Sequence, residues 1–240
     1  MKNELTNIKP LVTIITVVFN CEKFIENTIK SVTNKLNFNV EYIIIDGGSK
    51  DKTLEIIKKY DKVIDYWVSE PDKGIYDAMN KGITKAKGEF VYFINSGDIL
   101  IELPLEILEK NHDCKLVAFP VELSSNEIKK PKINNSIRIR NTLPHQGCFY
   151  KKTPSLKYNT LYKVFADFHL NQKMFKNNNK MVSFNYPIVA FHDLGGVSND
   201  KNNSSEIFKV VYDNHGVVFT ILSFFYFKKE GFLLRIKNLF

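Results

Sequence analysis

Runs of apolar residues alternate with segments of helical periodicity through the first hundred positions of the chain. Four of these runs are nearly continuous, as expected of strands buried on both faces, and they cover 11–19, 40–45, 63–68 and 89–94. Apolar residues also recur at helical spacing over 24–32, 54–60 and 75–86. Strands that alternate with helices need crossover connections, so the pattern predicts a doubly wound α/β fold with a mostly parallel sheet.

Polar residues stand just ahead of the predicted helices. Asn20 precedes the first helix, Ser49 or Asp51 the second, and Asp72 the third. Side chains of these types accept hydrogen bonds from the free amides of a first helical turn. Each of these residues therefore has a structural interpretation as an N-cap beside any functional one.

Beyond Asp98 the periodicity weakens. Short strands, antiparallel and partly exposed, are predicted over 116–123, 127–133 and 137–139. A helix is predicted over 167–175 and a further strand over 181–191, followed by a polar connector over 198–205. We expect one domain over residues 1–198, with a small antiparallel sheet beside the main one. A helical tail is expected over 199–240.

Three of the predicted strands end in clusters of acidic, small or glycine residues. The clusters occupy 46–49, 69–82 and 95–98. In an open α/β sheet the carboxyl ends of the strands are where ligands bind. The first cluster, Asp46-Gly47-Gly48-Ser49, is also compatible with a simple tight turn. Together the three clusters predict a ligand site along one edge of the sheet.

Composition narrows the class of protein without defining it. The chain has 240 residues, 44% hydrophobic and 25% charged, which suits one large α/β domain. The net charge of +8 suits phosphate ligands or an anionic membrane surface, and it equally serves solubility. The basic residues are scattered and carry no nucleic-acid-binding motif, so no nucleic-acid partner is expected.

The cysteines and the first residues indicate the compartment. Cys21, Cys114 and Cys148 are too dispersed for a disulfide framework or a zinc site, so we expect reduced thiols. Residues 1–9 are polar and do not resemble a signal peptide. The apolar stretch 216–227, about twelve residues long, is too short to span a bilayer as a helix. These features predict a cytoplasmic protein, with the inner face of the plasma membrane as a further place of attachment.

The order of the clusters at 46–49, 69–82 and 95–98, and their amino-acid sequences, resemble those of the family 2 glycosyltransferases of the GT-A fold. They are most similar to the bacterial subgroup that builds O-antigen, capsule and colanic-acid repeat units. The resemblance covers roughly residues 10–198. It implies a Rossmann-like GT-A domain and an inverting transfer of a hexose or N-acetylhexosamine from a UDP-sugar to a saccharide acceptor.

The resemblance assigns a set of residues to the donor. Asp46 corresponds to the aspartate that accepts a hydrogen bond from uracil N3, and Asp72, Lys73 and Asn80 fall in the stretch that lines the nucleotide pocket. All donor-binding residues that it implies are Thr16, Phe19, Asn20, Glu22, Asp46, Gly47, Asp72, Lys73, Asn80, Ser96 and Gly97.

The resemblance also assigns a metal site. Asn95-Ser96-Gly97-Asp98 stands where the family has its DxD motif, with Asp98 as the remaining carboxylate. One carboxylate with phosphate oxygens can hold Mn²⁺ or Mg²⁺, which would stabilise the charge of the departing diphosphate. His192 corresponds to a late histidine on the metal or diphosphate, although a lone histidine at a strand end is commonly a structural residue.

The general base is expected in the second half of the chain. Asp167, at the start of a predicted helix, matches the family's catalytic base, and Asp193 is the next candidate. Asp167 is also a credible N-cap. His145 and Gln146 match a His-Gln element near the donor sugar or the acceptor.

The tail mixes aromatic and aliphatic residues with Lys228, Lys229, Arg235 and Lys237. This mixture fits an interfacial amphipathic helix. Surface attachment would suit the lipid-linked, undecaprenyl-diphosphate type of acceptor that the subgroup uses. The alternative is that the tail packs on the catalytic domain or on a second copy of the chain in a homodimer.

Other classes lack their signatures. The first strand is followed by Phe19-Asn20-Cys21-Glu22, without the glycines of a dinucleotide-binding loop, and no P-loop motif occurs. A sugar nucleotidyltransferase shares the architecture but needs a glycine-rich, arginine-bearing loop at this place. A non-catalytic scaffold that binds nucleotide sugars stays open because the metal motif is reduced.

Overall fold

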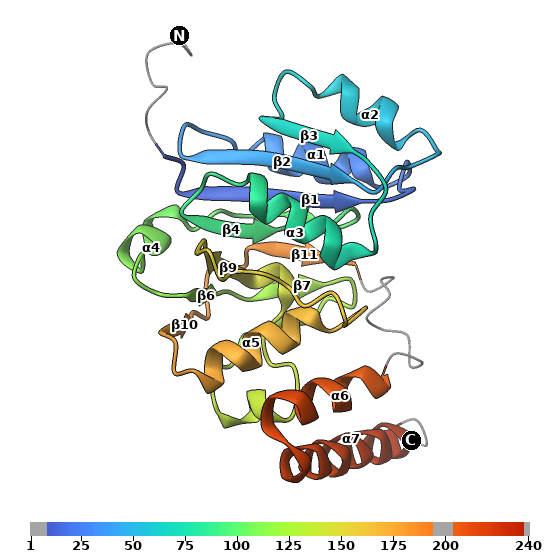
Figure 1. Ribbon diagram of the computed structural model, residues 1–240, viewed down its shortest axis with the longest axis vertical. Helices are drawn as coiled ribbons and strands as arrows, with labels where there is room; N and C mark the ends of the chain where they lie inside the picture. Colours follow the sequence, from blue (N-terminus) through green and yellow to red (C-terminus); the bar gives the residue numbers. More distant parts are fainter. Residues whose placement is uncertain (1–8, 194–203, 238–240) are drawn as a thin grey trace.

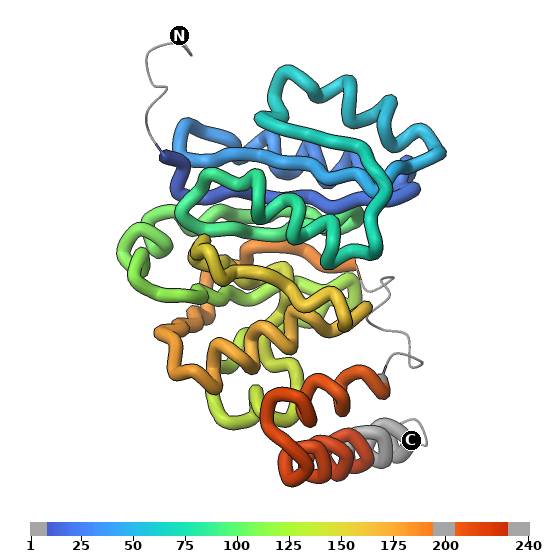
Figure 2. The backbone as a smooth tube through the Cα atoms, in the orientation of Figure 1, coloured from blue at the N-terminus to red at the C-terminus, as the bar shows by residue number. Residues whose placement is uncertain are grey.

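The computed structural model describes residues 9–193 and 204–237, and it contains a large sheet with helices on both faces (Figures 1 and 2). The seven strands of this sheet lie in the order β10 (Met181–Ser183), β6 (Leu116–Ala118), β9 (Cys148–Lys151), β4 (Phe90–Phe93), β1 (Val12–Val18), β2 (Val40–Asp46) and β3 (Tyr66–Ser69). Strand β9 is antiparallel to β4 and β6, whereas the other pairs are parallel. The predicted mostly parallel sheet is confirmed.

A second, four-stranded sheet lies beside the first. Its strands follow the order β5 (Ile99–Leu100), β11 (Ala190–His192), β7 (Val121–Leu123) and β8 (Ile128–Lys129). The pairs β5–β11 and β7–β8 are antiparallel, but β11 runs parallel to β7. The small sheet is therefore mixed, where the sequence predicted an antiparallel one.

The helices are α1 (Ile25–Thr33), α2 (Thr53–Lys59), α3 (Ile75–Lys85), α4 (Leu105–Lys110), α5 (Ala166–Lys176), α6 (Ser204–His215) and α7 (Val217–Lys237), with 3₁₀ turns η1 (Asn135–Arg138) and η2 (His145–Gly147). The predicted cap at Asn20 is wrong, because α1 begins at Ile25 and its cap position is Phe24. Asn20 instead has a positive φ of 49° in the loop before the helix.

Several predicted strands of the second half differ from the structure. The segment 116–123 divides at Pro120 between the two sheets, and 181–191 divides in the same way around a cis Tyr186–Pro187 bond. The strand predicted at 137–139 is wrong, because Asn134 accepts a hydrogen bond from the Ser136 amide and starts the 3₁₀ turn η1.

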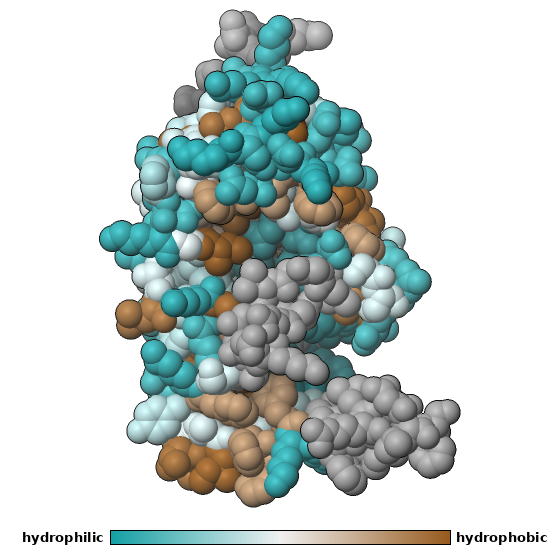
Figure 3. All heavy atoms as spheres, turned by 90° about the vertical axis from the view of Figure 1, so that its right-hand side faces the viewer, coloured by the Kyte–Doolittle hydropathy of each residue, from teal (hydrophilic) through white to brown (hydrophobic). Residues whose placement is uncertain are grey.

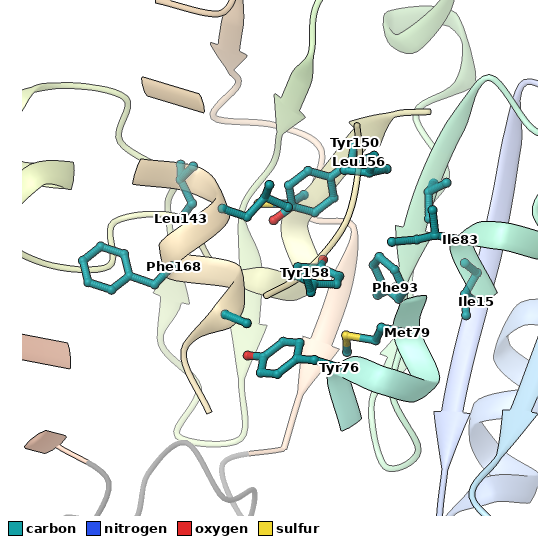
Figure 4. Packing of buried hydrophobic residues seen from close by; sticks show 14 of the residues in the cluster. Ile15, Tyr76, Met79, Ile83, Phe93, Leu143, Tyr150, Leu156, Tyr158 and Phe168 are labelled. Carbon is teal, nitrogen blue, oxygen red and sulfur yellow. The ribbon is translucent and has the colours of Figure 1, made fainter. Parts of the chain in front are cut away.

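Alternate side chains of the strands point into two hydrophobic clusters, one on each face of the large sheet. One cluster packs against α3, α5 and α6 and includes Ile15, Phe93 and Phe168 (Figure 4). The other packs against α1, α2 and α4. Helix α3 lies very close to β1, since a Cβ atom at Gly82 would stand 2.6 Å from the Ile15 side chain.

Helix α6 belongs to this core. Val210 and Val211 are fully buried in the first cluster. The Glu206 carboxylate accepts hydrogen bonds from the amides of residues 163–165, just before α5. We therefore propose that the catalytic unit extends through α6. The boundary expected at 198/199 lies outside the described residues, as does the Leu194–Ser198 part of the family resemblance.

Candidate active site

The carboxyl ends of β1 to β4 meet at one edge of the large sheet, on the right of Figure 1. Asp46 pairs in register with Val18 on one side and Ser69 on the other. The loops that follow these strands therefore lie next to one another. Figure 3 looks onto this edge and shows a recess with hydrophilic residues in the middle of the face.

Asp46 points into its own turn. Its carboxylate accepts hydrogen bonds from the amides of Gly48 (3.0 Å) and Ser49 (2.9 Å) and from the hydroxyls of Ser49 (2.5 Å) and Ser69 (2.6 Å). The residue is fully buried. These four bonds hold the loop after β2 against the end of β3, so the chain itself occupies the carboxylate that was expected to read uracil.

Asn20 and Glu22 join the loop after β1 to the loop after β2. The Asn20 side chain accepts from the Lys50 amide at 2.8 Å, and Glu22 accepts from the Lys52 amide at 2.9 Å. Thr16 is fully buried within β1 and shares a 3.1 Å hydrogen bond with the Tyr42 hydroxyl. The structure thus gives Asn20 and Glu22 a role in positioning the loops, and it does not bring Thr16 to the site.

Phe19, Gly47 and Asp72 meet at the open part of the same edge. A Cβ atom at Gly47 would lie 2.4 Å from an Asp72 carboxylate oxygen and 3.3 Å from the Phe19 ring. Phe19 is 58% exposed, and the other Asp72 oxygen accepts from the Gly74 amide. An exposed aromatic face and a carboxylate therefore stand side by side, with Gly47 leaving the space between them.

The third loop carries the other two predicted donor residues. Lys73 is exposed, and its backbone amide donates to Asp77 at 3.1 Å. The Asn80 amide group makes a pair of hydrogen bonds with the backbone of Tyr158, at 3.0 and 2.8 Å. Lys73 is free to reach a ligand, whereas Asn80 fixes the loop that leads toward α5.

Asp98, Gln146 and His192 form a compact polar cluster. The Gln146 amide nitrogen donates to Asp98 Oδ2 at 3.0 Å, and Asp98 Oδ1 lies 2.7 Å from His192 Nδ1. Gln146 Nε2 is also 2.9 Å from that ring nitrogen. Asp98 is only 3% exposed. The residues come from the loop after β4, from η2 and from the end of β11, so the fold assembles them from three distant segments.

The loop before Asp98 holds further polar atoms. Asn95 Oδ1 and Ser96 Oγ are buried and have no hydrogen-bond partner among the described residues. Gly97 has a φ of 102°, in the left-handed region that favours glycine, and its amide donates to the Thr28 hydroxyl at 3.0 Å. Within the described part of the chain, no three or more His, Cys, Asp or Glu side chains gather as a metal cage.

The donor set nevertheless fits a divalent cation that also binds substrate oxygens. Asp98 Oδ1 and His192 Nδ1 lie side by side, 2.7 Å apart, and a carboxylate oxygen and an imidazole nitrogen are both ligands that a divalent cation such as Mn²⁺ accepts. The unpartnered oxygens of Asn95 and Ser96 add to the oxygen-rich character of the site. Asp98 and His192 are the residues that would hold the ion.

Asp167 lies in the first turn of α5 and is 6% exposed. The cap position of α5 is Phe165, so Asp167 is not an N-cap. Its carboxylate lies 3.1 Å from the Tyr76 hydroxyl, which also reaches the Val164 carbonyl at 2.6 Å, and 3.4 Å from the Asn141 amide. Figure 4 shows Tyr76 extending from α3 toward α5.

The short turn η2 connects Asp167 to the Asp98 cluster. Gln146 contacts Asp98, and its neighbour His145 places Nδ1 3.9 Å from Asp167 Oδ2. Neither ring nitrogen of His145 has a hydrogen-bond partner among the described residues. Burial lowers the pKa of His145, against the opposing effect of the two carboxylates. Burial thus favours the neutral form of the imidazole, which lies between the two carboxylates.

Tyr76 and Asn141 were not predicted as site residues. Tyr76 falls in the segment 69–82, in which only charged and amide residues were predicted to bind the donor. Asn141 stands in a stretch without periodicity. The sequence gives no sign that either residue faces Asp167. Asp193, the second candidate base, follows directly after β11 and is exposed.

Comparison with known proteins agrees with this fold. The profile described as "Glycosyl transferase family 2" matches residues 13–176. The chain belongs to this family. An uncharacterized glycosyltransferase of Mycobacterium tuberculosis is 41% identical over 90 residues, which cover 37% of this chain and 34% of that protein. An uncharacterized glycosyltransferase of Haemophilus influenzae is 27% identical over 251 residues, covering 93% and 97%.

Solved structures share the GT-A fold. S. aureus TarS, residues 1–349 in complex with UDP, superposes with a TM-score of 0.67 at 17% identity, covering 85% of this chain and 64% of that one. The mannosyltransferase PcManGT of Pyrobaculum calidifontis, in complex with GDP-Man and Mn²⁺, gives a TM-score of 0.58 at 14% identity, covering 78% and 57%. At these identities the likeness shows the fold alone.

Proposed function

We propose that the protein is an inverting glycosyltransferase that moves a hexose or N-acetylhexosamine from a UDP-sugar to a saccharide acceptor. The observation that carries the proposal is the turn η2, whose adjacent residues face two buried carboxylates. Gln146 donates to Asp98, and His145 lies beside Asp167. A transferase of this kind needs a group for the leaving diphosphate and a base for the acceptor hydroxyl, and the two carboxylates supply both.

The uracil ring of the UDP-sugar is proposed to bind beside Phe19 and Asp72. The exposed Phe19 ring offers a stacking surface, and the neighbouring carboxylate can accept a hydrogen bond from uracil N3–H. Asp46 then acts indirectly, because it fixes the turn that carries Gly47. Lys73 is exposed at the same edge and suits a phosphate of the donor. UDP in TarS supports uridine as the nucleoside.

Asp98 and His192 are proposed to hold Mn²⁺ or Mg²⁺ together with oxygens of the donor diphosphate. The ion supplies positive charge that offsets the charge developing on the leaving UDP. Gln146 fixes the Asp98 carboxylate through its amide and so keeps the ligand in place. Mn²⁺ in the mannosyltransferase PcManGT supports this choice of ion.

Transfer is proposed to occur by a single displacement. The acceptor hydroxyl oxygen forms a bond to the anomeric carbon while the bond from that carbon to the diphosphate oxygen breaks. The hydroxyl proton passes to Asp167, and the electron pair of the broken bond leaves with UDP. Asn141 and Tyr76 orient the Asp167 carboxylate. One carboxylate suffices because no covalent intermediate forms, unlike in a retaining glycosidase.

The acceptor is proposed to be a lipid-linked saccharide of undecaprenyl-diphosphate type, in the synthesis of a surface polysaccharide such as O-antigen or capsule. This proposal rests on the resemblance of the motifs at 46–49, 69–82 and 95–98 to those of the bacterial subgroup described above. It places the enzyme in the cytoplasm, close to the inner face of the plasma membrane.

Exchanging Asp167 for Asn tests the assignment of the base. Asp167→Asn should lower kcat by about 10²–10⁴-fold, because general-base removal has this cost, and it should leave UDP affinity unchanged. The matched control is Asp193→Asn, which should keep kcat within a few-fold of the wild type. A normal kcat in Asp167→Asn together with a loss in Asp193→Asn would transfer the role to Asp193.

The released product distinguishes the remaining alternatives. A glycosyltransferase releases UDP from a UDP-sugar plus acceptor. A sugar nucleotidyltransferase instead forms diphosphate from UTP and a sugar phosphate, and a scaffold binds UDP without turnover. Detection of UDP that depends on added acceptor supports the proposed function over both.

A further inference from the structure

Helix α7 carries a face of large apolar side chains directed to solvent. Val217, Val218, Ile221, Leu222, Phe224 and Phe225 are each between 50% and 64% exposed. Figure 3 shows hydrophobic residues gathered at the bottom of the molecule, where Figure 1 places α6 and α7. A contiguous patch of this kind on a protein surface marks an interaction site.

The opposite face of α7 is seated on the protein. Ser223 is fully buried and its hydroxyl donates to the Ile139 carbonyl at 2.7 Å. The Arg140 guanidinium donates to the Tyr226 hydroxyl and stacks on its ring at 4.8 Å. The helix is therefore held on the body of the protein, and the apolar face is presented outward.

A basic pocket opens at the start of this apolar face. It has a volume of about 670 Å³ and is lined by Arg138, Lys176 and His215 and by the first residues of α7, among others. Asp213 also lines it, and its carboxylate accepts a hydrogen bond from the Tyr162 hydroxyl. Arg138 lies over the rings of Phe175 and Phe219, at 5.5 and 5.4 Å.

The positive charge of this pocket is incompletely neutralised. Arg138 forms no ion pair with a side chain that the structure describes, and its Nε is buried without a partner there. His215 Nε2 is likewise buried and unpartnered within those residues. Burial, together with the positive charges of Arg138 and Lys176, lowers the pKa of His215 to about 4. Such a pocket suits a phosphate group.

Cationic side chains also follow the apolar face at its other end. Lys228 and Lys229 are exposed, and the stretch 217–229 contains no acidic residue. A second copy of the chain packed antiparallel on α7 would place these lysines against the apolar residues at the start of the partner's helix, where the carboxylate of Asp213 already accepts a hydrogen bond from Tyr162. An anionic surface with an apolar interior matches both the lysines and the apolar face.

We propose that α7 docks the protein on an anionic phospholipid surface. The six apolar side chains enter the interface, a lipid phosphate group binds in the Arg138 pocket, and Lys228 and Lys229 contact neighbouring headgroups. No helix in the described part of the chain has the length and hydropathy to cross a membrane, so the contact is with one leaflet. This inference rests on α7 and its surroundings and is independent of the proposed transfer reaction.

Cosedimentation of the full-length protein with vesicles tests the proposal. Vesicles of phosphatidylcholine with phosphatidylglycerol should bind the wild type at least tenfold more tightly than vesicles of phosphatidylcholine alone. Phe225→Glu should abolish this binding, because it puts a carboxylate into the apolar face. The matched control is Phe38→Glu, which makes the same change at a side chain that is 67% exposed. Phe38 precedes β2, a strand that lies far from α7 in Figure 1.

Two further variants separate the basic contacts. Replacing Lys228 and Lys229 with Gln should weaken binding to the anionic vesicles about 25-fold, since each cationic side chain near such a surface contributes about fivefold. Arg138→Gln should weaken it at least fivefold, and excess inorganic phosphate should compete with the vesicles in the wild type only partly. Circular dichroism confirms that each variant folds.

Three results would overturn the proposal. Equal binding to both vesicle types would remove the role of charge. Binding by Phe225→Glu at the wild-type level would remove the role of α7. A dimer in sedimentation equilibrium that Phe225→Glu dissociates, with no vesicle binding by the wild type, would assign the face to a second copy of the chain. Point variants are preferred to a truncation of the whole tail, because a truncation that also removed α6 would remove residues of the core.

Discussion

The loops after β1, β2 and β3 differ from the cluster around η2 in how their polar groups are satisfied. In the loops, the side-chain oxygens of Asp46, Asn20 and Glu22 accept hydrogen bonds from backbone amides, and Asp46 also accepts from two hydroxyls. Around η2, the ring nitrogens of His145 and the side-chain oxygens of Asn95 and Ser96 are buried without a partner in the described residues. The first region holds its shape by itself, whereas we propose that a ligand satisfies the unpartnered groups of the second.

This difference separates residues that shape a site from residues that act in it. A buried polar group without a partner costs roughly 1–3 kcal/mol, so such groups persist where a ligand satisfies them. Asp46, whose carboxylate is fully buried and bonded to the amides and hydroxyls of its own loops, contributes by position. The structure therefore gives Asp46 the character of a positioning residue, and we propose that His145 contacts a ligand.

The largest effect is expected at Asp98. Asp98→Asn should lower kcat/KM about 10³-fold, because a cation on the leaving group is worth several kcal/mol and each 1.36 kcal/mol is a factor of ten. A titration of activity with Mn²⁺ should shift to higher concentration in the variant. Asp113→Asn, at a carboxylate paired with Lys180 on the surface, is the control and should behave as the wild type. Full activity of Asp98→Asn in EDTA would show that no metal is needed.

The parallel strands β1 to β4 could be predicted from the sequence, because each is a continuous apolar run. Strand β9 could not. Its four residues, Cys148–Lys151, show no distinct pattern, and they form a strand because β4 and β6 flank them. The division of 181–191 between two sheets is likewise a property of the tertiary fold.

The candidate site shows the same limit. Asp98, His192 and Asp167 could be proposed from their resemblance to a family, but the contact of Asp98 with His192 spans 94 positions of the chain. No local pattern encodes such a separation. The orientation of Asp46 also could not be predicted, because a strand-end aspartate does not reveal whether neighbouring amides and hydroxyls already occupy its oxygens.

A pair of variants sharpens the distinction between shaping and acting. Asp46→Asn should lower the free energy of unfolding by about 3 kcal/mol, because an amide NH₂ would face donors that now bond a buried carboxylate. Asp72→Asn should change stability by less than about 1 kcal/mol, since this side chain is partly exposed, and should weaken UDP binding about tenfold. Chemical denaturation and calorimetric titration with UDP measure the two effects. Weak UDP binding by Asp46→Asn together with normal UDP binding by Asp72→Asn would assign the contact with the uracil to Asp46 instead.

His145 is expected to show a smaller effect, of opposite sign for stability. His145→Phe should raise the free energy of unfolding by about 1 kcal/mol, because it removes unpaired buried nitrogens while keeping a ring against Phe93. It should also lower the rate of transfer at least tenfold. His145→Gln is the matched control, since it keeps polar atoms at the position and should not gain stability. A loss of stability in His145→Phe would mean that the imidazole is satisfied in the free protein.

The smallest effect concerns acid sensitivity. Burial lowers the pKa of His145, so between that value and the usual 6.5 the unfolded chain binds a proton that the folded protein does not. Stability must therefore fall as the pH drops below about 6.5, and His145→Phe should lose part of this slope. His169 and His215, whose pKa values burial also lowers, keep the rest of the slope in both proteins. The stability gain of His145→Phe should accordingly be larger at pH 5.5 than at pH 8. An equal gain at both values would indicate that His145 takes up its proton equally well in the folded and unfolded states, so that the effect of the two carboxylates cancels the effect of burial.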